Sequence, residues 1–130
     1  MSRPAANPND EPEIQRRRRE MVDLARAMLR GEIGILAGAR RMLVYRFGAG
    51  LDESDDDMLT FVAIESQEDH LPVDPSERAH WNAEALARND VEIAEAEAFH
   101  RPAALAACES LVRRFAAPDE SAPSDPNEIG

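Results

Sequence analysis

The sequence contains no lysine, a single cysteine and few aromatic residues, which make up 5% of its 130 positions. One cysteine excludes an internal disulfide bond and a zinc site made of several cysteine ligands. No apolar stretch approaches the ~20 residues that cross a bilayer, and residues 1–19 lack the apolar segment of a signal peptide. We therefore expect a cytoplasmic protein that does not enter membranes.

Charge is divided unevenly along the chain. Residues 1–46 hold ten arginines against six acids, whereas residues 47–130 hold five arginines against twenty acids, a balance of −15. An acidic surface repels phosphate groups, which argues against nucleic-acid binding, and it attracts and steers basic proteins. The four arginines of the run Arg16–Arg19 spread around a helix and cannot all share one side of it. We interpret the run as a docking face for acids of this chain or of a second copy.

The composition of the whole chain and the periodicity of its first third favour packed helices. Alanine is abundant, with 22 residues, and apolar residues make up 43% of the chain. The first predicted helix begins at Asp10–Glu13 and ends at Gly31. The second carries apolar residues at spacings of three and four from Ile33 to Phe47 and is stopped by Gly48.

The middle of the chain predicts two short helices. Ser54 is expected to cap the first of them, with three acids at its positive end. Residues 58–64 could form a buried strand by residue type, but a lone strand has no partner, so we favour helix. The run Asp74-Pro75-Ser76-Glu77 is typical of a helix start, and Trp81 is expected to anchor that helix in the core.

The last third is strongly helical from Ala83 onward. Asn89 opens a possible capping box, and Pro102 is expected to kink the pattern or to restart it as a helix that runs to about Phe115. Cys108 lies in this apolar pattern and is interpreted as a small buried side chain, not a reactive thiol. The expected inward positions are Leu86, Ile93, Ala96, Ala98 and Phe99.

Together these segments predict an all-α protein. Residues 10–117 are expected to form a single domain, a compact bundle of four or five helices. Residues 1–9 and 118–130 carry prolines and no periodic apolar pattern, so we expect disordered tails there.

The loop after the third predicted helix is the candidate recognition site. Carboxylates beside a histidine perform acid–base chemistry when burial separates their pKa values, but the sequence shows no nucleophile with a matched base. The polar residues therefore brace a turn, or they form a recognition loop beside an apolar patch. The candidate binding residues are Phe61, Glu65, Glu68, Asp69, His70, Leu71 and Trp81.

Two Glu-x-x-His spacings provide an alternative. Glu77 with His80, and Glu97 with His100, place both side chains on one helix face, as in carboxylate-bridged di-metal bundles. Such a site also needs a glutamate from each of two further helices, and only Glu32 and Glu65 are available.

The segment from Phe61 to Pro72, followed by Arg78, Trp81 and Ala85-Leu86, resembles a family of small uncharacterised bacterial proteins of the proteobacterial type. The resemblance runs from about Val22 to Phe115, and Pro102 departs from its pattern. No activity comes with this family. The resemblance implies that the segment from Phe61 to Pro72 and Trp81 belong to the centre of the domain.

These observations favour a function in binding, not in catalysis. We expect a small acidic protein-binding module, in an accessory or toxin-neutralising role, that uses no cofactor. Its partner is expected to be a basic protein, or a second copy of the chain. The alternative is a metal-dependent enzyme of the helical-bundle type that uses the two Glu-x-x-His pairs.

Overall fold

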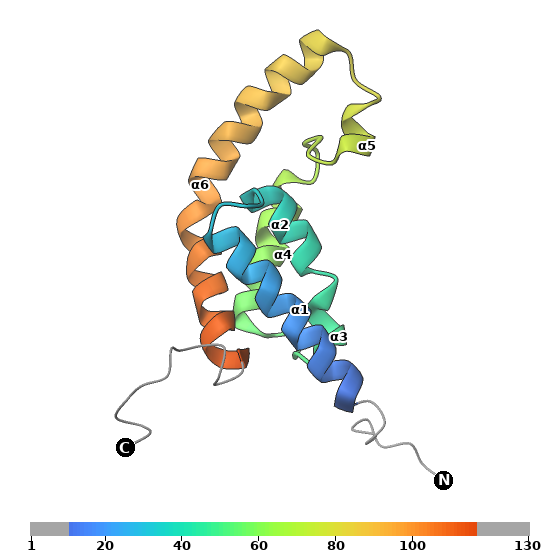
Figure 1. The fold of residues 1–130 in the computed structure, drawn as a ribbon. Helices are drawn as coiled ribbons and strands as arrows, with labels where there is room; N and C mark the ends of the chain where they lie inside the picture. Colours follow the sequence, from blue (N-terminus) through green and yellow to red (C-terminus); the bar gives the residue numbers. More distant parts are fainter. Residues whose placement is uncertain (1–10, 117–130) are drawn as a thin grey trace.

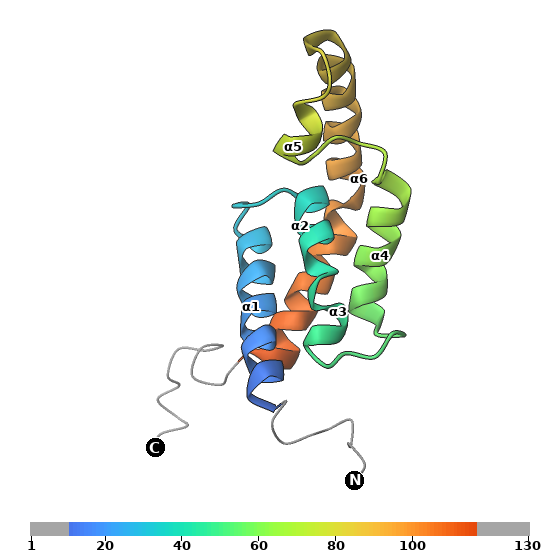
Figure 2. The same ribbon diagram turned by 90° about the vertical axis from the view of Figure 1, so that its right-hand side faces the viewer.

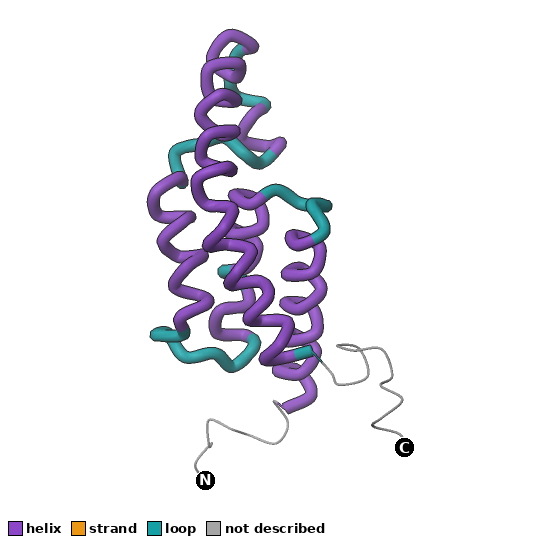
Figure 3. The backbone as a smooth tube through the Cα atoms, turned by 90° about the vertical axis from the view of Figure 1, so that its left-hand side faces the viewer, coloured by secondary structure: helices purple, strands orange, loops and turns teal. Residues whose placement is uncertain are grey.

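The computed structural model describes residues 11–116, which form helices and the loops between them (Figure 3). The predicted tails, 1–9 and 118–130, and the capping role of Asp10 lie outside the described residues. The helices are α1 (Glu11–Leu29), α2 (Ile35–Met42), α3 (Tyr45–Gly48), α4 (Asp56–Glu68), α5 (Pro75–Arg78) and α6 (Ala83–Phe115).

The long helix α6 organises the bundle. Helices α1, α2 and α4 pack against its C-terminal half, whereas its N-terminal half extends beyond them beside α5 (Figures 1 and 2). The predicted all-α compact bundle is therefore confirmed, and so is the choice of helix over strand for residues 58–64. None of the helices between residues 11 and 116 is long and apolar enough to cross a membrane.

The core between these helices is made of methionine and alanine together with leucine, isoleucine, valine, one cysteine and one phenylalanine. Met21, Met28, Met42 and Met58 are all buried, since a flexible thioether fills irregular gaps between helices. Cys108 is buried as expected, and its thiol lies 3.7 Å from the sulfur of Met28. Burial, with a smaller contribution from nearby acids, raises the pKa of this thiol to about 12, so it is unreactive as a nucleophile.

The predicted second helix is interrupted. Helix α2 ends at Met42, and a turn precedes the single-turn helix α3. This turn leaves Val44 65% exposed and Phe47 61% exposed, although both belong to the apolar pattern from Ile33 to Phe47 that predicted the helix, and Ala49 and Leu51 enter the core instead. The carbonyl of Ala49 accepts a hydrogen bond from Arg18 of α1 at 2.8 Å, so the turn brings this part of the chain against α1.

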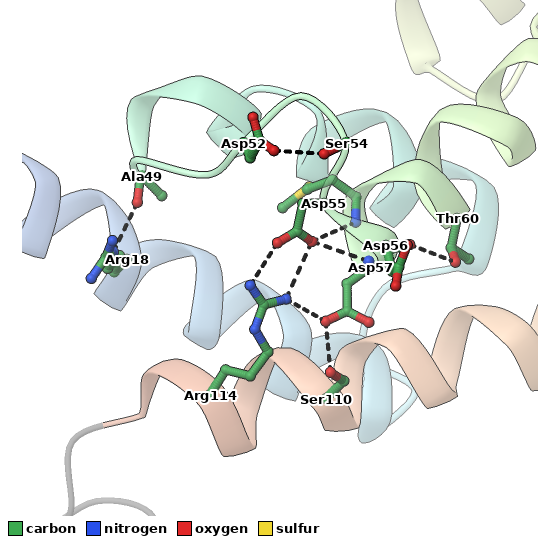
Figure 4. Close-up of polar contacts among 11 residues, drawn as sticks. Arg18, Ala49, Asp52, Ser54, Asp55, Asp56, Asp57, Thr60, Ser110 and Arg114 are labelled. Carbon is green, nitrogen blue, oxygen red and sulfur yellow. Dashed lines mark hydrogen bonds and ion pairs between the residues drawn. The ribbon is translucent and has the colours of Figure 1, made fainter.

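The start of α4 is fixed by acids, and not by Ser54 as predicted. The carboxylate of Asp55 accepts hydrogen bonds from the backbone N–H groups of Asp57 and Met58, whereas Ser54 donates to Asp52 (Figure 4). Arg114 of α6 binds both Asp55 and Asp57 at 2.6 Å (Figure 4). The last turn of α6 is thereby joined to the first turn of α4.

Helix α6 runs without a break through Asn89 and Pro102, so the predicted restart is wrong. Pro102 lies on the exposed side, where water can satisfy the carbonyl that loses its helical partner. The inward face also differs from the predicted one. Ala96 is buried as predicted, but Ala98 and Phe99 face solvent, and His100, which was not among the predicted inward residues, is buried.

The contact between Arg114 and Asp55 predicts an acid-dependent stability. Arg114 lowers the pKa of Asp55, so the stabilisation is present above the unfolded pKa near ~4 and is lost as the pH falls through the folded value. We expect Arg114→Gln to destabilise the protein by about 1 kcal/mol at pH 7 and by less at pH 3. Urea unfolding at several pH values measures this, and Arg113→Gln, an exposed neighbour, is the control. Equal losses for Arg114→Gln at both pH values would contradict the assignment.

Candidate functional site

Arg40 of α2 holds together the segment that follows α4. Its side chain is only 15% exposed. The guanidinium donates to Glu65 of α4 and to Glu77 of α5, each at 2.9 Å, and to the carbonyl of Leu71 at 3.0 Å. Because a guanidinium has five donors in a rigid plane, one side chain fixes three separate pieces of backbone relative to each other.

The short helix α5 begins as predicted. Pro75 occupies its first turn, and Glu77 accepts a hydrogen bond from the backbone N–H of Asp74, as in a capping box. Arg40 lowers the pKa of Glu77, which keeps this carboxylate charged. The next residue, Arg78, pairs with Asp90 of α6 at 2.8 and 3.1 Å, so α5 is tied to α2 on one side and to α6 on the other.

The segment held in this way forms a pocket of about 220 Å³, which we call the Trp81 pocket. Trp81 is 44% exposed, so its predicted role as a core anchor is wrong; it follows the end of α5 and faces the pocket. Four of the seven predicted binding residues, Asp69, His70, Leu71 and Trp81, line this pocket. The other lining residues are Pro72, Glu77 and His80.

The remaining three predicted binding residues lie elsewhere. Phe61 is fully buried in the core, so a partner cannot contact it in the folded protein. Glu65 is engaged by Arg40, and Glu68 pairs with the buried His100 at 2.8 Å. These three side chains hold α4 in place and so position the pocket, but they do not line it.

The two Glu-x-x-His pairs have separate roles. Glu77 binds Arg40, Glu97 binds the start of α2, and His100 binds Glu68. Between residues 11 and 116, no three side chains of the metal-ligating types converge in a way that could hold an ion. The four residues therefore do not form the di-metal arrangement of the alternative hypothesis.

Glu97 performs a structural task that the sequence did not reveal. Its two carboxylate oxygens accept hydrogen bonds from the backbone N–H groups of Ile35, at 2.7 Å, and Leu36, at 2.9 Å. The cap position of α2 is Gly34, which has no side chain to do this. Glu97 of α6 supplies the missing carboxylate at the positive end of the α2 dipole and sets the position of Arg40.

His70 joins the pocket to α6. Its Nε2 atom lies 3.0 Å from Glu92 of α6, and Glu92 raises the pKa of the imidazole. Both side chains are exposed, so this pair marks the boundary of the pocket on the surface and contributes little to stability.

The comparisons with protein-family models, curated proteins and solved structures give no match to this chain. The resemblance to small bacterial proteins of unknown function therefore stays a prediction.

The role of Arg40 can be tested by Arg40→Lys. Lysine keeps the charge but cannot reach three acceptors in one plane, so we expect a loss of about 2 kcal/mol in unfolding free energy. We also expect faster amide exchange in residues 69–81 and a red shift in the emission of Trp81, the single tryptophan. Arg41→Lys, at the exposed neighbouring position, is the control. Unchanged exchange in residues 69–81 would show that Arg40 does not hold the pocket.

The cap supplied by Glu97 can be tested in the same way. Glu97→Ala leaves two N–H groups of α2 without their partner, and we expect a loss of about 1–2 kcal/mol by urea unfolding. Glu109→Ala changes an exposed glutamate of the same helix and is expected to have almost no effect. A similar loss for both variants would mean that the cap is unimportant.

Proposed function

We propose that this protein is a protein-binding module of the bacterial cytoplasm, with an accessory or toxin-neutralising role, whose Trp81 pocket receives a segment of a basic partner protein. The observation that carries the proposal is the exposure of the single tryptophan at the rim of a pocket braced from three helices. Tryptophan combines a large apolar surface with little side-chain entropy, and it is strongly enriched among the residues that dominate binding energy.

The charge around the pocket supports a basic partner. Residues 47–130, which include the whole pocket, carry a balance of −15. Within the pocket, Glu77 is compensated by Arg40, but the carboxylate of Asp69 is exposed and has no ion pair among residues 11–116. Such a field speeds the encounter with a cationic surface and repels an acidic one.

The rigidity of the pocket also supports binding. Leu71 and Pro72 are buried, and the backbone around them is fixed by Arg40 and Arg78. A partner therefore meets a surface that is already formed, which reduces the conformational entropy lost on association.

A capture experiment from the native host tests this function. Immobilised protein is expected to retain a basic protein at low salt, and retention should fall as salt screens the contact. With the purified partner, Trp81→Ala is expected to weaken binding by about 2 kcal/mol or more. Phe47→Ala, which removes another exposed aromatic side chain on α3, is the matched control and should bind normally.

Two results would contradict the proposal. One is capture that is insensitive both to salt and to Trp81→Ala. The other is a mass of the isolated protein above that of one chain, measured by light scattering, that returns to the mass of one chain in Trp81→Ala. This result would assign the pocket to a second copy of the chain.

A further inference from the structure

Phe99 is the most exposed large apolar side chain in the described part of the chain, at 76%. Its position follows from the register of α6, because His100 turns inward to meet Glu68 and the preceding residue must then point outward. The ring makes a T-shaped contact with His100, with 5.0 Å between ring centroids, and most of its surface stays exposed.

The other surface phenylalanines of this protein each have an arginine over the ring. Arg46 lies over Phe47, with 5.0 Å to the centroid, and Phe115 has Arg114 at 4.6 Å and Arg18 at 4.9 Å. Phe61 is buried in the core. Between residues 11 and 116, no cation lies over Phe99. Phe99 is therefore an exposed ring without the arginine that the other two have.

Phe99 also borders a depression of about 260 Å³, which we call the Phe99 hollow. The hollow is lined by Glu68, Glu92, Glu95, Ala96 and Phe99. Glu68 pairs with His100 at 2.8 Å and Glu92 with His70 at 3.0 Å, but Glu95 is exposed and has no partner in the described region. An aromatic face beside an uncompensated carboxylate is complementary to a flat cation.

The hollow adjoins the Trp81 pocket. His70 lines the pocket and is bonded to Glu92, which lines the hollow, so a single side-chain pair separates the two. One extended segment of a partner can therefore contact both.

We propose that the Phe99 hollow binds an arginine side chain of the basic partner, with the guanidinium over the Phe99 ring and paired with Glu95. This inference rests on the proposed function and makes it more specific, because it requires an arginine and not merely positive charge. A lysine ammonium is compact and strongly hydrated, so it gains less from the ring face than a guanidinium does.

The test uses the full chain and two synthetic probes of equal charge, hexa-arginine and hexa-lysine. Titration calorimetry at low salt is expected to show tighter binding of hexa-arginine. Phe99→Ala and Glu95→Gln are each expected to weaken hexa-arginine binding by about three- to fivefold, and Phe99→Ala should leave hexa-lysine binding almost unchanged. Val91→Ala and Glu109→Gln, at exposed positions of α6 outside the hollow, are the matched controls.

Equal binding of the two peptides, or hexa-arginine binding that Phe99→Ala does not change, would overturn the assignment. So would equal losses from Glu95→Gln and Glu109→Gln, since these would reflect overall charge alone. The outcome is separable from the proposed function. Capture that depends on Trp81 but not on Phe99 refutes only the hollow, whereas hexa-arginine binding that depends on Phe99, without any captured partner, refutes only the protein-binding role.

Discussion

The contacts of the Arg40 guanidinium hold in place the part of the molecule that carries the Trp81 pocket. This guanidinium comes from the basic first third of the chain and is surrounded by carboxylates and carbonyls of the acidic remainder. Arg114 plays a similar part within the acidic remainder itself, where it pairs with Asp55 and Asp57. The uneven charge of the sequence is thus partly neutralised inside the fold. What is left for partners is a smaller set of exposed acids, including Asp69 and Glu95.

Much of the fold could be predicted because helix periodicity and capping are local. The start of α5 follows from a pattern a few residues long, whereas helix is favoured over residues 58–64 because no other segment offers a strand partner. The errors arose where a residue distant in the sequence decides how a helix continues or which of its faces is buried. Helix α6 continues through Pro102 because neighbouring helices hold both sides, and its inward face is set by the pairing of His100 with Glu68, a residue 32 positions earlier.

The site was predictable in part for the same reason. Composition identified two parts of the site, namely the loop Asp69–Leu71 and the side chain of Trp81. Arg40, the residue that holds them, was missed. A signal was present, because Arg40 falls in the apolar stripe of its helix, between Leu36 and Leu43, where a charge must find partners. The role of Glu97 had a weaker signal, namely a helix whose cap position is a glycine, and only the tertiary structure could name the carboxylate that replaces it.

The two halves of helix α6 are held in the fold by different kinds of contact. From Ala96 onward it contributes buried residues to the core, whereas the turns before Ala96 contribute only the half-buried Ile93 and are otherwise held by ion pairs such as Arg78 with Asp90. Local opening of that first half does not require the core to come apart, so it can occur as a separate low-energy fluctuation. A ligand that contacts both halves of α6 would suppress this local opening. The conformational entropy that the helix then loses would weaken the binding of that ligand.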